Sequence, residues 1–582
     1  MSFHMTFLLT FLFILSAIVF RLIYLVDIRS HAVAESELRT PILESTSSLT
    51  AADDLSNIFW FIQSYLDSFN VPRLNDDVNY FRQYGARGRL NTLSHLFTLG
   101  KPYGNYSFIA LDVCPDPGLS RPLNFFGVLT QDTERALRRF IEITKNDNHT
   151  FWFGHYPTST IVPSSVIRSL IGSSGFAYLC GHLHTWLGWA PKMYALQPHG
   201  FLELELGDWR DNRRYRILAV DHDLVSFVDV RFHATNASRE WPIVLITNPK
   251  HANFLLPHKE PVSRIAHSTH IRILAWSKWP VVQVSVRVDD IPLGNATKSR
   301  VDMNTSTPNP LYVLPWDPSI WNTHSVHTIQ VTVHDSAGNF RVVSQPFIVQ
   351  GTPPWNFSFL ASFLLNNDHT FNLRAVFYGL WFLLIGTLSL PRILNRIWTR
   401  RILCRTCLGT GVYRLSNCDN LMYPIVCYLV YVVTGPIFMG YLVQSHFGVV
   451  FSFGVYIAGT FVTESLTYFY ELIQLLIFAP VLLGLIWHLG YRNTTHQTPA
   501  SSEHSVKSDN YRAHCCSPRI LHIPISLFLI CSVFTVLQIR LCLFSVCYPY
   551  GVHALFLSPG RIGPLVLAWY LAYNSHVPAM SY

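Results

Sequence analysis

The chain has 582 residues, of which 49% are hydrophobic and only 13% are charged, and its formal net charge at pH 7 is +8. A chain of this length can form two or three domains with cores of their own, but its composition is too apolar for an ordinary soluble protein. We therefore expect part of it to lie in a lipid bilayer. The positive charge does not indicate nucleic-acid binding, because the arginines concentrate beside apolar stretches, where membrane topology accounts for them.

The first apolar stretch predicts a signal anchor or signal peptide over residues 1–27. Met5–Phe20 contains no charged residue, and the apolar run resumes after Arg21. Either kind of segment directs the following residues into the secretory pathway. No small-x-small cleavage site is evident, which favours an uncleaved anchor. Residues 28–56 are polar and serine-rich and are predicted to form a linker.

Alternating strands and helices are predicted for residues 57–240. Apolar stretches of strand length occur at 58–62, 106–111, 151–153 and 176–180. Asp132–Ile141 has the apolar spacing and the acidic start that are typical of an amphipathic helix. Phe201–Leu206 and Tyr215–Val220 are interpreted as strands of a second sheet. This order predicts an α/β unit in which helices cover a sheet.

Three histidines follow two of these predicted strands. The first strand is followed by Gly154-His155, and the second by Gly181-His182-Leu183-His184. Neutral imidazole is the commonest metal ligand in proteins, and glycine lets the backbone turn sharply or approach a ligand closely. A single histidine at a strand end is more often an ordinary polar residue. Two such pairs after neighbouring strands instead predict a shared site.

The pattern resembles the last two motifs of the calcineurin-like metallophosphoesterases, Gly-His and Gly-His-x-His, and the whole chain resembles a membrane-attached member of that family. The resemblance implies a sandwich of sheets and hydrolysis of a phosphoester by two divalent metal ions that share a carboxylate and a hydroxide. It assigns His155 and His182 to the second metal and His184 to the first. The substrate would be a phosphoester of unknown identity.

The first three metal motifs of that family are absent. Relatives carry Asp-x-His, Gly-Asp-x-x-Asp and Gly-Asn-His-Asp before the Gly-His motif. In this chain, Gln63 is followed directly by a segment that resembles the sequence after Gly-Asn-His, with Asp67 as the last residue of that motif. The junction looks as if one contiguous block had been removed. Alternative splicing, an incomplete gene model and evolutionary loss are all open explanations.

Half of a two-metal site would then be missing. Histidines without a bridging carboxylate hold two dications poorly, because little offsets the repulsion between the metals. We therefore expect at most one metal ion, for example Zn²⁺ on the three histidines, and little or no phosphoesterase activity. Candidate replacement carboxylates are Asp53, Asp54, Asp112 and Asp208, although a linker, turn or strand-end role is the more ordinary interpretation of each. The alternative hypothesis is a membrane protein without enzymatic activity whose luminal domains bind a partner.

An all-β domain is predicted for residues 241–350. Short strands such as Val281–Val288 and His327–Val333 are separated by turn residues, and His334–Asn339 indicates a hairpin. Strands at this spacing are typical of an immunoglobulin-like sandwich. The domain contains no cluster of catalytic residue types, so its expected role is spacing or binding.

Residues 375–573 are predicted to form an all-α domain with several membrane spans. The predicted spans are 375–390, 421–443, 448–461, 466–489, 520–548 and 552–573. The loop after the first span carries Arg392, Arg396, Arg400, Arg401, Arg405 and Arg414 with no acidic residue before Asp419. This bias places the loop in the cytoplasm and the preceding domains in the lumen or outside the cell.

Two features of this region stay open. Residues 491–519 contain basic residues and a glycosylation sequon at Asn493, which indicate opposite sides of the membrane. Glu471 is the one acidic residue inside a predicted span, and we expect a packing or interfacial position for it rather than a role in transport.

Six further sequons precede the first internal span and are predicted glycosylation sites: Asn105, Asn148, Asn236, Asn295, Asn304 and Asn356. Their position agrees with a luminal or extracellular location of this part of the chain.

Overall fold

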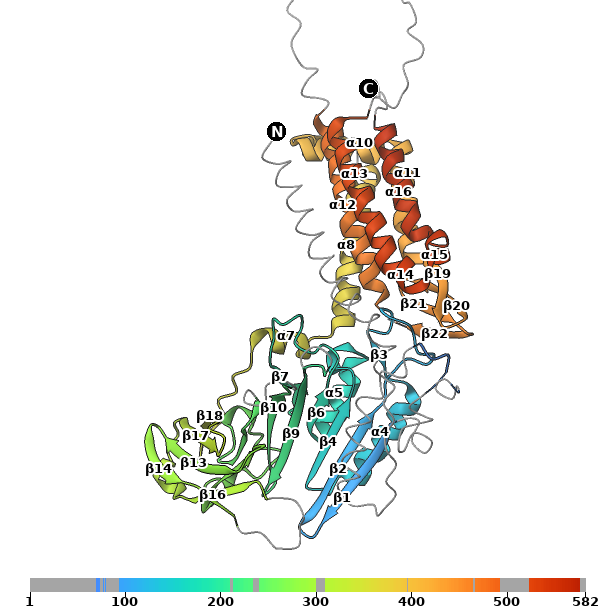
Figure 1. Ribbon diagram of the computed structural model, residues 1–582. Helices are drawn as coiled ribbons and strands as arrows, with labels where there is room; N and C mark the ends of the chain where they lie inside the picture. The colour runs from blue at the N-terminus through green and yellow to red at the C-terminus, as the bar shows by residue number, and fades with distance from the viewer. Residues whose placement is uncertain are drawn as a thin grey trace, which may run out of the picture.

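The computed structural model describes residues 70–73, 77, 79, 94–209, 213–233, 240–299, 309–394, 396–463, 466–491 and 523–575. A helical bundle forms one end of the molecule, and two β-rich parts lie at the other end (Figure 1). Several predicted features lie outside the described residues: the anchor, the linker, the junction after Gln63, Asp53, Asp54, Asn236, Asn304 and Asn493.

The N-terminal part is built on a six-stranded sheet with the order β1-β2-β4-β6-β8-β7. Its strands are β1 (His95–Lys101), β2 (Gly104–Leu111), β4 (His149–Gly154), β6 (Gly175–Cys180), β7 (Met193–Leu196) and β8 (Leu202–Glu205). The four strands β2, β4, β6 and β8 run parallel, and β1 and β7 flank them in antiparallel orientation. The strands predicted at 106–111, 151–153 and 176–180 are therefore confirmed.

Both faces of this sheet are covered, which is why its central parallel strands β4 and β6 are largely apolar. Helices α4 (Gln131–Thr144) and α5 (Ser164–Ser174) supply Leu137 and Ile167 to one core, which also contains Trp152 of β4. On the opposite face, a two-stranded sheet of β9 (Arg214–Asp221) and β10 (Leu224–Arg231) packs against Phe151. Two short strands, β3 (Gly127–Val128) and β5 (Ile161–Val162), pair beside the main sheet.

The position predicted for Phe201–Leu206 was wrong. This segment forms β8 of the main sheet, parallel to β6, and only the Tyr215–Val220 segment belongs to the second sheet. Alternation of leucine and glutamate favours a strand with one face in water. Here both glutamates are buried, because hydrogen-bond donors from other elements meet their carboxylates.

The second β-rich part is a sandwich of two four-stranded sheets, with the orders β11-β12-β16-β15 and β14-β13-β17-β18. The strands are β11 (Ile243–Asn248), β12 (His270–Trp276), β13 (Val281–Val288), β14 (Ile291–Asn295), β15 (Thr297–Lys298), β16 (Leu311–Pro315), β17 (His327–Asp335) and β18 (Phe340–Phe347). Alternate residues of both sheets, such as Ile273 and Val331, meet in one core. The predicted immunoglobulin-like architecture is confirmed.

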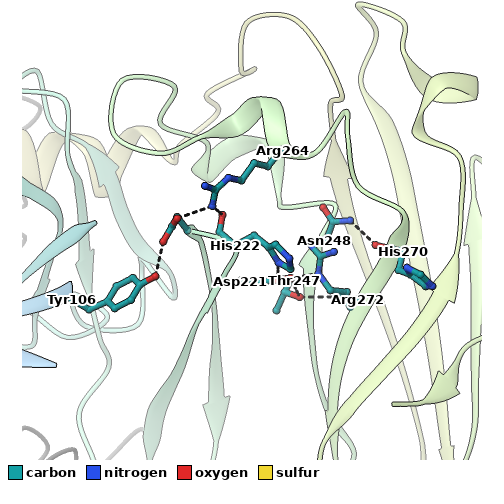
Figure 2. Close-up of polar contacts among 9 residues, drawn as sticks. Tyr106, Asp221, His222, Thr247, Asn248, Arg264, His270 and Arg272 are labelled. Atoms are coloured by element: carbon teal, nitrogen blue, oxygen red, sulfur yellow. Dashed lines mark hydrogen bonds and ion pairs between the residues drawn. The ribbon is translucent and has the colours of Figure 1, made fainter. Parts of the chain in front are cut away.

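The turn between β9 and β10 fastens this sandwich to the N-terminal sheet (Figure 2). Asp221 accepts hydrogen bonds from Arg272 at 2.6 Å and from Thr247 at 2.7 Å, both in the sandwich domain. Asp223 accepts from Tyr106 of β2 at 2.5 Å and from Arg264 at 2.6 Å. The two domains thus share a polar contact made by two carboxylates of a single turn.

The bundle consists mainly of α8 (His369–Ile393), α10 (Cys407–Asn417), α11 (Asp419–Thr434), α12 (Thr467–Tyr491), α13 (Ile525–Cys542) and α16 (Pro559–Asn574). Three helical stretches among the described residues are long and apolar enough to cross a membrane: 369–393, 467–491 and 525–550. The predicted spans at 375–390, 466–489 and 520–548 fall on these helices. The prediction of an integral membrane protein is supported.

The prediction of an all-α membrane domain was wrong. Helix α11 ends at Thr434, and β19 (Pro436–Val443), β20 (His446–Phe451), β21 (Gly454–Ile457) and β22 (Thr460–Thr463) form an antiparallel sheet in place of the spans predicted at 421–443 and 448–461. Pro436 stops the helix, because proline has no amide donor and disfavours helical backbone before it. Ala458 and Gly459 both have positive φ, as a tight two-residue hairpin requires.

The span predicted at 552–573 is also interrupted. Helix α15 (Val552–Phe556) ends before Leu557, and α16 starts at Pro559. Proline fits the first turn of a helix but not its interior, so the chain restarts a helix there.

The ends of the helices assign sides to the connecting segments. Arg414 of α10 donates a hydrogen bond to the carbonyl of Leu489 at 2.6 Å, so α12 ends at the arginine-rich end of the bundle. The segment after α12 therefore starts on the side of the predicted cytoplasmic loop. The sheet β19–β22 lies at the other end, beside the N-terminal domain (Figure 1).

Glu471 lies inside the bundle and faces a cation that the sequence did not reveal. The Nη2 atom of Arg561, on α16, lies 4.0 Å from its Oε1 atom, and both side chains are buried. Arg561 also donates to Gln474 at 2.7 Å, and the amides of Gln474 and Gln538 bond each other. This polar cluster joins α12, α13 and α16, which agrees with the packing position expected for Glu471.

Candidate functional site

The carboxyl ends of the parallel strands bring the predicted site residues to one edge of the main sheet. Asp112 follows β2, His155 follows β4, and His182 and His184 follow β6. Asp208 comes shortly after β8. Ligands of open α/β sheets bind at this edge, because the loops there are held by several strands at once.

His155 and His182 form the closest pair of site residues. The Nε2 atom of His155 lies 2.9 Å from the Nδ1 atom of His182, and Phe125 and Tyr156 pack against the ring of His182. Burial lowers the pKa of His155 to about 3, with a smaller contribution from the positive charge of His184. Burial also holds the pKa of His182 well below its usual value. Both imidazoles are therefore neutral at pH 7, which is the form that binds metal ions.

His184 contacts two acidic residues. Its Nδ1 atom lies 3.3 Å from Asp208, and its backbone amide donates to Glu205 at 2.7 Å. The backbone of His184 has a positive φ of 56°, a conformation that is uncommon for residues other than glycine. The structure thus brings His155 and His182 together and pairs His184 with Asp208.

Asp112 does not complete the site. It lies next to His155 in the strand register, but its carboxylate accepts a hydrogen bond from the amide of Cys114 at 3.0 Å and so caps the turn that follows β2. Burial raises its pKa to about 7. Asp112 thus makes a turn-capping contact, whereas Asp208 faces His184, one of the candidate ligands.

These residues do not fit a two-metal centre. Across the described ranges, no group of three or more His, Cys, Asp or Glu side chains is arranged to hold a metal ion. Nitrogens that share one tetrahedral zinc ion are about 3.3 Å apart, so the two hydrogen-bonded imidazoles would have to separate slightly to bind one. The arrangement can offer two neutral nitrogens to a cation, but it lacks the carboxylate that would bridge a second.

Sequence reasoning missed a pair of buried glutamates on β8. Glu205 accepts from the amide of His184 and lies 3.1 Å from the thiol of Cys180, and burial raises its pKa to about 8. Glu203 accepts from the amide and the hydroxyl of Thr158, both at 2.7 Å, and from Gln197. Burial raises its pKa to about 6. The position of β8 next to the strand of the Gly-His-x-His motif is the signal that could have identified them.

The segment that leads to the first membrane helix clamps the histidine loop. Leu183, between the two histidines, packs against Leu364 and Leu365 of α7 (Phe359–Asn366). Arg168 of α5 donates to the carbonyls of Leu365 and Asn367, both at 2.9 Å, and to Thr158 at 2.9 Å. Arg168 therefore connects Thr158, which donates to Glu203, with the segment that leads into α8.

The edge that carries the site faces the membrane domain. The loop after β2 passes from Asp112 to Phe125, beside His182, and in between it inserts Leu119 and Leu123 into the core under β19–β22. The amide of Ser120 donates to the carbonyl of Leu442 at 3.1 Å. One loop therefore touches both the candidate site and the sheet β19–β22, which is called the membrane-proximal sheet below.

Comparison with known proteins identifies relatives of the chain. The family model for the TMEM62 Ig-like domain matches residues 238–353. Transmembrane protein 62 of Mus musculus is 36% identical over 511 residues, which covers 87% of this chain and 74% of the mouse protein. A protein of Arabidopsis thaliana provisionally named a metallophosphoesterase is 26% identical over 357 residues, which covers 51% of this chain and 47% of that protein. No solved structure matches the chain.

Proposed function

This chain belongs to the transmembrane protein 62 family, and we propose that it is an integral membrane protein whose N-terminal domain has a metallophosphoesterase-like fold but no phosphoesterase activity. The family membership and the apolar helices support the membrane assignment.

Three observations support the phosphoesterase-like interpretation of the N-terminal domain. Gly-His and Gly-His-x-His follow neighbouring parallel strands, β4 and β6, at the edge where ligands bind in such sheets. A distant relative also carries the name of a metallophosphoesterase. The second sheet, β9–β10, packs on the main sheet as the second layer of a sandwich would.

The observation that carries the proposal is the composition of the site. His155 and His182 meet in a hydrogen bond, His184 pairs with Asp208, and no Gly-Asp-x-x-Asp or Gly-Asn-His-Asp motif precedes Gly154 in the sequence. Two dications held close together need negative ligands between them. With two neutral nitrogens, the site would hold one metal ion at most.

We infer that the N-terminal domains lie on the luminal or extracellular side of the membrane. The arginine-rich segment between α8 and α11 favours the cytoplasm for the opposite end of the bundle. The sequons at Asn105, Asn295 and Asn356 are exposed on the N-terminal domains, where glycosylation would be compatible with the fold.

The test compares this chain with a version in which a block carrying Asp-x-His, Gly-Asp-x-x-Asp and Gly-Asn-His-Asp from a family member is restored after Gln63. Both are purified in full length and assayed with an aryl phosphate and Mn²⁺, and their bound metal is measured by mass spectrometry. The proposal requires activity and two bound metals in the restored chain only. Equal activity in both chains would refute it.

A further inference from the structure

The sheet β19–β22 presents an aromatic face that no described residue covers. Tyr441 lies opposite Phe447, and Tyr456 lies opposite Phe461, in the strand register. Val449 lies two residues after Phe447 on β20 and pairs with Tyr456 of β21. Because alternate residues of a strand point to the same face of a sheet, all these side chains share one face. With Phe453 of the intervening turn, the aromatic residues of this face are 38–51% exposed.

The other face of the same sheet is buried against protein. Phe438, Leu442, Val450 and Val455 pack with Leu119 and Leu123 of the N-terminal domain and with Tyr470 of α12. One face is thus a structural core, and the other is a surface with the same apolar character. A contiguous exposed apolar surface of this kind marks an interaction site.

The chemistry of this segment identifies a lipid bilayer as the occupant. Residues 420–463 contain no Lys, Arg, Asp or Glu, and His446 is their one titratable imidazole. A surface that faces water normally carries interspersed charges. The rim of a protein interface normally carries charged residues, whereas the margin of this sheet offers only uncharged polar side chains such as Gln444 and Thr463.

The aromatic face continues onto the lipid-facing flank of the bundle. Tyr441 packs edge-on against His553 of α15, with ring centroids 5.1 Å apart. Val552 and Phe556 of α15 and Val566 of α16 are also exposed. The sheet lies next to α15 at the end of the helices (Figure 1). A bilayer around the helices would therefore meet the sheet without a break.

The edge strand β22 limits how deep the sheet can lie in a bilayer. The strands have four to eight residues, and β22 ends the sheet order, whereas the opposite edge strand, β19, bonds the amide of Ser120 and the carbonyl of Leu557. Strands this short do not span a bilayer, and an open edge in hydrocarbon would leave backbone groups without hydrogen bonds. Tyrosine and other aromatic side chains favour the level of the lipid headgroups, where edges can reach water.

We propose that the aromatic face of β19–β22 lies in the headgroup layer of the bilayer, on the side of the N-terminal domains. The sheet is a membrane-surface anchor in addition to the spanning helices. Through Leu119 and Leu123 on its opposite face, it holds the loop that runs to Phe125, and thus the candidate site, at a fixed height above the membrane.

Photo-crosslinking tests this proposal on the full-length protein. A benzophenone amino acid is placed singly at Phe447 or Tyr456, and the protein is reconstituted in phosphatidylcholine nanodiscs. Phe382, exposed on the spanning helix α8, is the positive control, and Phe340, exposed on the sandwich domain, is the negative control. These are conservative replacements of exposed rings, so the fold should persist.

We expect illumination to add the mass of one phosphatidylcholine at Phe447, Tyr456 and Phe382 and to add none at Phe340. The proposal is overturned if Phe382 forms the lipid adduct while Phe447 and Tyr456 do not. It is equally overturned if those two positions cross-link to a second copy, to another protein, or to another segment of the same chain.

Discussion

The Nε2 atom of His155 lies 2.9 Å from the Nδ1 atom of His182. These nitrogens come from the two Gly-His motifs of the candidate site, and in this chain they bond each other. The hydrogen bond satisfies two buried polar atoms that would otherwise need a metal ion or water. A metal ion must therefore compete with this bond, and it gains no bridging carboxylate in return.

Metal binding should follow this pairing. His155→Ala removes one of the two converging nitrogens, whereas His184→Ala removes a side chain that is held by Asp208. We expect the full-length protein to bind at most one equivalent of Zn²⁺, and His155→Ala to weaken binding at least tenfold. His184→Ala should change the affinity less than threefold. Titration calorimetry measures both, and equal losses in the two variants would show that the three histidines share one ion.

The buried carboxyl of Glu203 should make stability depend on pH. Its pKa is 4.5 when unfolded and about 6 in the fold, where burial is the main cause. The protonated carboxyl of Glu203 makes its full contribution to stability below pH 4.5, and this contribution is lost as the pH rises through 6. The difference corresponds to about 2 kcal/mol. Glu203→Gln, which cannot titrate, should therefore lose less thermal stability than the parent between pH 4.5 and pH 7.5. If the thermal stability of the variant and of the parent changed with pH in the same way, the raised pKa of Glu203 would be contradicted.

Arg168 should stabilise the connection between the site and α8. It is buried and donates to two backbone carbonyls, of Leu365 and Asn367. Arg168→Ala leaves these acceptors unpaired, which should cost about 3 kcal/mol and expose the 358–368 segment to protease. Arg139→Ala, on the exposed face of α4, is the matched control and should change stability by about 0.5 kcal/mol or less. Identical cleavage rates in both variants would show that Arg168 is not the clamp.

Glycosylation should report the orientation of the chain. Asn105, Asn295 and Asn356 are exposed, whereas the amide of Asn148 donates to Asp223 at 3.0 Å. In a eukaryotic cell, replacing the three exposed asparagines with glutamine should reduce the mobility shift that a glycosidase also removes. Asn493→Gln should have no effect, since α12 ends at the opposite end of the bundle. A glycan on Asn493 together with no glycan on Asn105, Asn295 or Asn356 would show that the chain has the opposite orientation in the membrane.

The sequence predicted the strands that carry the histidines because an apolar run followed by glycine and histidine has few other interpretations. Their convergence followed from parallel pairing alone. It did not predict that His184 turns to Asp208, since this depends on the positive φ at His184 and on Glu205, which looked like a surface residue in an alternating strand. Burial of that strand depends on its neighbours, which a local pattern does not contain.

The membrane-proximal sheet was missed for a different reason. The apolar residues of 448–461 suit either a short span or strands, and mean hydropathy does not distinguish the two. The turn at Ala458-Gly459 and the break at Gly435-Pro436 were the available signals. The partner of Glu471 was missed because Arg561 lies far along the chain and precedes no recognisable motif.

The most direct test of the account is the activity of this chain beside the same chain with the three missing motifs restored, each with its His155→Ala variant as control. Aryl phosphate hydrolysis with Mn²⁺ should be at background in this chain and unchanged by His155→Ala. The restored chain should hydrolyse the substrate and lose that activity in its His155→Ala variant. Hydrolysis by the unrestored chain that depends on His155 would contradict the claim that its site is incomplete.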